Sequence, residues 1–207
     1  MYRHLREQIV TKEISPGSQL VEKSIEAELS VSRTPIRQAI RRLCDEGFAK
    51  LYAHRGAFVM NPSETEVLQA FEMWKYLEIK VAELVYNQVT YSDLQQLNKW
   101  ISEGEQAWEA GDVERYLEAD KEFHLLLAWK TGNELLHEFL ERIINQVHVY
   151  VRMLERHSKT IPVIGRVKDH YSVVDALEEQ DLSLLQTTLD EHTRYHATAW
   201  SWERSRQ

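Results

Sequence analysis

Two residues one helical turn apart, Asp120 and His124, are the first candidates for chemistry in this chain. Side chains four residues apart project from one face of a helix. A carboxylate oxygen beside an imidazole nitrogen is half of a binding site for a divalent metal. A histidine that is merely packed in a core fits the same spacing, so the pair alone leaves both interpretations open.

Two more imidazoles, His170 and His192, follow toward the end of the sequence, 22 residues apart. A helix, a turn and an antiparallel helix fill an interval of this length, and such a hairpin brings its two imidazoles together. Helical periodicity dominates this part of the chain. We expect six helices, over residues 64–88, 91–110, 113–130, 134–157, 163–179 and 182–203. They predict an all-α domain over residues 63–207.

Residues 1–62 indicate a different module. Apolar residues at helical spacing predict a helix in the first dozen residues and a second over 23–29. A third helix is expected to open at Arg33, with Thr34 as its N-cap and Pro35 at its first position. Two β-like runs, 48–52 and 57–60, predict a hairpin. Together these elements predict a mainly α protein with an N-terminal winged helix-turn-helix domain.

The charge distribution supports this division. The chain of 207 residues has a net charge of -8, yet residues 1–62 hold ten Lys and Arg against seven Asp and Glu, a net +3. The remaining residues, 63–207, hold fifteen Lys and Arg against twenty-six Asp and Glu, a net charge of -11. A basic head on an acidic body indicates nucleic-acid binding by the head alone. Ser32, Arg33, Thr34 and Arg37 would offer a polar face to the major groove.

The sequence resembles the GntR family of bacterial transcription regulators over the stretch SPGSQLVEKSIEAELSVSRTPIRQAIRRLCDEGFAKLYAHRGAFV. The resemblance implies a homodimer that binds double-stranded, pseudo-palindromic operator DNA, and repression as the outcome. It also implies which residues contact the operator. They are Lys23, Ser32, Arg33, Thr34 and Arg37, with His54, Arg55 and Gly56 at the wing.

The second half resembles the FCD effector domain of the FadR subfamily, and its six helices are similar to the VanR-like branch. Members of that family often bind a metal through one Asp and three His. The ligand motifs of that family are matched here by the segment from Asp120 to His124, by Asp169-His170 and by Glu191-His192. The implied ligands are therefore Asp120, His124, His170 and His192. They would leave positions open on Zn²⁺, Ni²⁺ or Mn²⁺ for a small carboxylate metabolite.

The first helix of this domain departs from the family pattern. Relatives commonly carry an Arg four residues before the Glu that is Glu78 here, whereas this chain has Trp74. We therefore assign Trp74, Lys75 and Glu78 to a candidate effector pocket. Two alternatives stay open: a regulator that senses the metal directly, without an organic effector, and, less favoured, a metal-dependent hydrolase. No HExxH or GxSxG motif accompanies the ligands.

The other histidines and the cysteine are weaker candidates. His196 follows His192 by one turn and could replace it, whereas His137, His148 and His157 lack a matching context. Cys44, the only cysteine, is interpreted as a small packed hydrophobe. We expect a cytoplasmic protein without membrane contact. The sequence has one cysteine, no apolar run approaching about 18 residues, and no signal-peptide pattern at the N-terminus.

Overall fold

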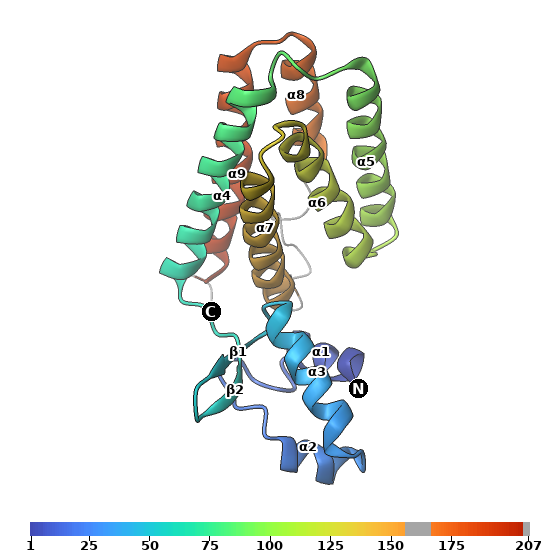
Figure 1. Cartoon of the computed structure of the whole chain (residues 1–207), viewed down its shortest axis with the longest axis vertical. Coiled ribbons are helices and arrows are strands. Elements are labelled where there is room, and N and C mark those ends of the chain that lie inside the picture. Colours follow the sequence, from blue (N-terminus) through green and yellow to red (C-terminus); the bar gives the residue numbers. More distant parts are fainter. Residues whose placement is uncertain (156–166, 205–207) are drawn as a thin grey trace. The chain divides into compact units, whose positions relative to one another are not determined.

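The structure is a computed structural model that describes residues 1–155 and 167–204. The described helices are α1 (Tyr2–Val10), α2 (Glu22–Leu29), α3 (Arg33–Asp45), α4 (Glu64–Val85), α5 (Tyr91–Glu109), α6 (Val113–Lys130), α7 (Glu134–Glu155), α8 (Val167–Glu178) and α9 (Leu182–Arg204). The strands β1 (Ala49–Tyr52) and β2 (Gly56–Val59) form one antiparallel hairpin. The predicted mainly α fold, with a winged head and six further helices, is confirmed (Figure 1).

The chain divides into two compact units. The head unit comprises Met1–Ser63 and the described end of α7 from His148 onward. The helical unit comprises Glu64–Val147 and the described residues of α8 and α9. Within the helical unit, α5 packs on α6 and α8, and α4 packs on α6 and α9.

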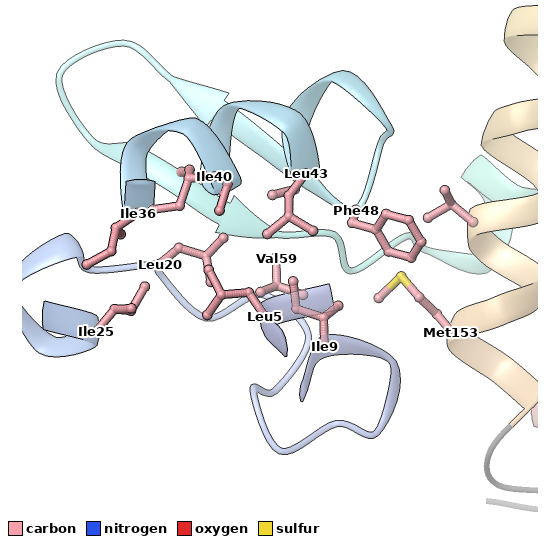
Figure 2. Close-up of a cluster of buried hydrophobic side chains, with 14 residues drawn as sticks. Leu5, Ile9, Leu20, Ile25, Ile36, Ile40, Leu43, Phe48, Val59 and Met153 are labelled. Atoms are coloured by element: carbon pink, nitrogen blue, oxygen red, sulfur yellow. The ribbon is translucent and has the colours of Figure 1, made fainter. Parts of the chain in front are cut away.

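The head is built around α3, against which α1, α2 and β1 all pack. The apolar positions of α3 that the periodicity assigned to its inner face, Ile36, Ala39, Ile40 and Leu43, are buried. Leu5 and Ile9 from α1 complete this core, and Gln19 pairs with Phe58 at the edge of the hairpin. The same core takes in Val149 and Met153 from α7, and Figure 2 shows Met153 beside Phe48.

The beginning of α3 differs from the prediction. Ser32, not Thr34, is the N-cap, with extended backbone angles (φ -61°, ψ 158°) and no side-chain capping bond. Thr34 and Pro35 therefore lie inside the first turn. The first four N–H groups of a helix have no partner within it, so proline is tolerated throughout that turn. The prediction of Thr34 as the cap is wrong for that reason.

Polar caps fix where the helices of the helical unit begin. Thr90 and Asp93 form a reciprocal capping box at α5, and Asp112 accepts a hydrogen bond from the Arg115 amide at the start of α6. Asp181 does the same for the Leu184 amide in α9, at 2.9 Å. These caps set the helical phase and so determine which residues face the interior. In the described part of the chain no helix is long and apolar enough to cross a membrane.

Candidate metal centre and nucleic-acid interface

The four predicted metal ligands converge in the interior of the helical unit. Asp120 and His124 come from α6, His170 from α8 and His192 from α9, and all four are buried. One potential ligand atom from each lies within 4.8 Å of the other three. Residues separated by up to 72 positions in the sequence are thus brought to one point by the packing of three helices.

The distances between these atoms fit a metal centre. Nε2 of His124 lies 3.2 Å from Nε2 of His170. Oδ1 of Asp120 lies 3.9 Å from Nε2 of His124 and 3.5 Å from Nε2 of His170. Two ligands on one tetrahedral Zn²⁺, with bonds of about 2.0–2.1 Å, are separated by about 3.3 Å. The imidazole of His192 is adjacent, with its ring centroid 4.6 Å from that of His170.

The electrostatics of the cluster also favour a cation. Two carboxylates, Asp120 and Glu78, are buried there, and no Lys or Arg is buried among the described side chains. Burial alone lowers the pKa of His124, but the neighbouring carboxylates of Glu78 and then Asp120 outweigh it, so the pKa is raised. A divalent ion held by neutral imidazoles would balance the two negative charges.

The three residues assigned to the effector pocket have different surroundings. Glu78 lies against His124, with 2.7 Å between its Oε1 and Nδ1 of the imidazole. The Trp74 ring contacts His124 edge-on, at 5.2 Å between centroids, and stacks with Phe71. Lys75 instead lines a separate surface pocket with Thr193 and pairs with Asp190 at 3.2 Å. The structure therefore brings Trp74 and Glu78, but not Lys75, to the candidate metal ligands.

A small cavity adjoins the cluster on the side away from α4. Its volume for the centre of a water molecule is about 10 Å³, close to the least that can hold one water molecule. Asp120 and His170 form one wall, and the other lining residues are Trp100, Ile101, Gly104, Tyr116, Ala119 and Phe123. The cavity therefore has room for no more than one water-sized ligand beside Asp120 and His170.

The predicted DNA contacts are exposed on the head. Lys23, Ser32, Arg33, Thr34 and Arg37 all face solvent around the start of α3. The guanidinium Nε of Arg33 lies 2.9 Å from Glu26, and that of Arg37 lies 2.8 Å from Glu22, so α2 supplies a carboxylate to each arginine. Sequence reasoning missed both acidic partners, because the crossing of α2 over α3 determines which of the α2 carboxylates reach them.

The wing places three more predicted contacts at the tip of the hairpin. His54 and Gly56 both have positive φ, 60° and 88°, which produces the tight turn. The Gln19 amide donates to the Arg55 carbonyl at 2.6 Å and holds this turn from outside the hairpin. The Arg55 guanidinium lies over the Phe58 ring, 5.4 Å from its centroid.

The remaining candidates lie elsewhere. Cys44 is half-buried, and its pKa is raised by burial and by Asp45. The His137 ring contacts Trp129, and His148 is buried in the head unit. His157 and the side chain of His196 lie outside the described residues.

Comparisons with known proteins match both halves of the chain. The FCD domain matches residues 69–195, and the family of bacterial regulatory proteins called gntR matches residues 1–59. The HTH-type transcriptional repressor RspR of Escherichia coli (strain K12) is 26% identical over 192 residues, covering 93% of this chain and 83% of that protein. The Nta operon transcriptional regulator of Aminobacter aminovorans is 28% identical over 154 residues, 73% of this chain and 71% of that one.

Solved structures agree on the fold. The structure of McbR/YncC from E. coli covers 97% of this chain and 95% of its own, with a TM-score of 0.71 and 20% sequence identity.

Proposed function

The chain belongs to the GntR family of transcriptional regulators that carry an FCD domain, and we propose that it is a metabolite-responsive repressor. In this proposal residues 1–62 bind DNA and residues 63–207 bind the effector. Family membership makes the chain a regulator and not an enzyme, so the hydrolase alternative is rejected.

The head supports the first half of the proposal. Exposed arginines at the start of α3 are suited to base edges or phosphates in the major groove, and the Arg55 turn is suited to the backbone or the minor groove. Two heads related by a twofold axis in a homodimer would bind the two halves of a pseudo-palindromic operator.

The single observation that carries the second half is the convergence of Asp120, His124, His170 and His192 in the interior of the helical unit. Their donor set suits Zn²⁺, Ni²⁺ or Mn²⁺. Such an ion would act as a Lewis acid that receives the carboxylate of a small organic acid. Effector binding would alter operator affinity to the extent that it prefers one of two states of the protein.

A second candidate function, direct metal sensing, is favoured by the charges around the cluster. Asp120 and Glu78 would neutralise a divalent ion, so a bound organic anion would add one negative charge that no buried Lys or Arg among the described side chains balances. Trp74 stands where the family resemblance leads us to expect an arginine, and its ring packs on His124. In this version the metal itself changes operator affinity.

One titration separates the two candidates. An operator duplex, selected from a random-sequence library and fluorescently labelled, is titrated with metal-stripped protein. Zn²⁺, Ni²⁺ or Mn²⁺ is then added alone, and afterwards together with acetate, lactate or benzoate. A shift in anisotropy that needs both metal and acid supports metabolite response. A full shift with metal alone supports direct metal sensing, and no shift under any condition contradicts both.

A further inference from the structure

Glu78 on α4 contacts the candidate metal cluster of Asp120, His124, His170 and His192 without belonging to it. It is buried, with 4% of its surface exposed, and its Oε1 lies 2.7 Å from Nδ1 of His124 on α6. The opposite nitrogen of the same ring, Nε2, is the atom close to His170 and Asp120. The ring of His124 therefore lies between a carboxylate on one side and the candidate ligands on the other.

Folding alone gives little reason for a carboxylate at this position. Oε2 of Glu78 has no hydrogen-bond partner among the described residues, and Nδ1 of His124 lies 2.7 Å from Oε1 without the alignment of a full hydrogen bond. The two lysines of α4 are paired with other carboxylates, Lys75 with Asp190 and Lys80 with Glu83. A buried carboxylate with one oxygen unsatisfied lowers stability, so packing does not explain its presence here.

The orientation of the His124 ring is already restricted by its neighbours. Trp74 contacts the ring edge-on at 5.2 Å, and Phe123 does so at 5.2 Å with an interplanar angle of 86°. These aromatic contacts hold the plane of the imidazole, but they do not determine which of its nitrogens carries the proton. That choice is made by the hydrogen bond to the nitrogen that faces away from the ligands.

We propose that Glu78 is a positioning residue for His124: its Oε1 accepts the Nδ1 proton and thereby leaves Nε2 unprotonated toward Asp120 and His170. The inference rests on the proposed metal-binding function. It assigns Glu78 a role behind a ligand instead of contact with an effector. The carboxylate also contributes the second negative charge that a divalent ion in this site requires.

Three variants separate the hydrogen bond from the charge and from packing. Glu78→Gln keeps an oxygen acceptor and removes the charge, and Glu78→Leu removes both. Glu83→Leu, on the exposed face of the same helix, is the matched control. Metal-stripped full-length proteins are titrated with Zn²⁺ against a chromophoric chelator, and long-range ¹H–¹⁵N spectra of ¹⁵N-histidine-labelled protein report the His124 tautomer.

We expect Glu78→Leu to weaken Zn²⁺ binding about 10- to 100-fold, as loss of a partner behind a metal ligand usually does. Glu78→Gln should lose less Zn²⁺ affinity than Glu78→Leu, and Glu83→Leu should bind Zn²⁺ as tightly as the wild type. The metal-free Glu78→Leu protein should still unfold cooperatively and keep the wild-type circular dichroism spectrum at the temperature of the titration, which excludes misfolding as the cause. In metal-free wild type at pH 8 the proton should be on Nδ1, and in Glu78→Leu it should be distributed over both nitrogens.

Wild-type Zn²⁺ affinity in Glu78→Leu, or a wild-type His124 protonated on Nε2, would overturn the role of Glu78. Failure of the metal site itself has a different signature. A wild-type chain that binds no Zn²⁺ would contradict the proposed function. The His124 tautomer measured in metal-free protein would still show whether Glu78 accepts the Nδ1 proton.

Discussion

Arg37 at the start of α3 is held by Glu22 of α2, with its Nε 2.9 Å from Oε1 and 2.8 Å from Oε2 of that carboxylate. The Nε of Arg33 is paired with one oxygen of Glu26, Oε2, at 2.9 Å. Both pairs are exposed, and exposed ion pairs contribute little to stability. Exchanging the carboxylates for DNA phosphates or base edges should therefore cost little.

The first prediction concerns the arginines themselves. Arg33→Ala or Arg37→Ala should weaken operator binding by about 1–3 kcal/mol if the side chain contacts a base. Lys80→Ala, an exposed lysine of the helical unit, is the control and should not change affinity. Anisotropy titrations of a selected operator duplex give the affinities. Unchanged binding by an arginine variant would exclude that side chain from the contact.

The second prediction concerns the acidic partner. Glu22→Gln removes a negative charge near the DNA-binding face and releases Arg37, so affinity for any duplex should increase, most clearly at low salt. Because the added attraction is electrostatic, operator and random duplex should gain alike. Weaker operator binding by this variant would show instead that Glu22 is needed to orient Arg37.

The third prediction is a steep dependence on salt. Operator affinity should fall linearly on a double logarithmic plot against salt concentration, because phosphate neutralisation releases counterions. Arg37→Ala should reduce the slope by about 1 if it contacts a phosphate. A flat response would contradict the assignment of the basic head to DNA, given a net charge of -8 for the whole chain.

Most of the fold follows from local signals. The helices begin where Thr90, Asp112 and Asp181 supply caps, and apolar spacing identifies the inner face of α3. The cap of α3 was misassigned because several positions in a first turn tolerate proline. The burial of Val149 and Met153 in the head core was also missed. Periodicity shows that a residue is buried, but not which unit buries it.

The candidate site was likewise predictable only in the part that follows from local spacing and the family pattern. Spacing places Asp120 and His124 on one helix face, and the family pattern adds His170 and His192, which the fold brings together. The relation of Glu78 to His124 depends on how α4 lies against α6, and 46 residues of sequence separate the two. No local pattern reports a contact of that kind, so sequence reasoning placed Glu78 in the effector pocket.

The fourth prediction uses the one pKa with a defined alkaline window. Burial, and then the hydrogen bond that the Tyr2 hydroxyl donates to Glu46, raise the pKa of Tyr2 from 10.0 to about 12. A raised folded-state pKa gives stability that is fully present below pH 10 and is lost as the pH rises toward 12. Tyr2→Phe should be less stable than wild type at pH 8, and the difference should shrink above pH 10. Urea unfolding measures this, and a difference independent of pH would contradict it.

The fifth prediction concerns His124 and is also the most direct test of the account. Protein purified without a polyhistidine tag is incubated with Zn²⁺, Ni²⁺ or Mn²⁺, freed of excess and assayed by elemental mass spectrometry. Wild type and His137→Ala, which changes a histidine outside the cluster that contacts Trp129, should retain about one ion per chain. His124→Ala should retain almost none while its head still binds DNA. No metal in wild type, or a full complement in His124→Ala, would contradict the assignment of Asp120, His124, His170 and His192 as the metal ligands.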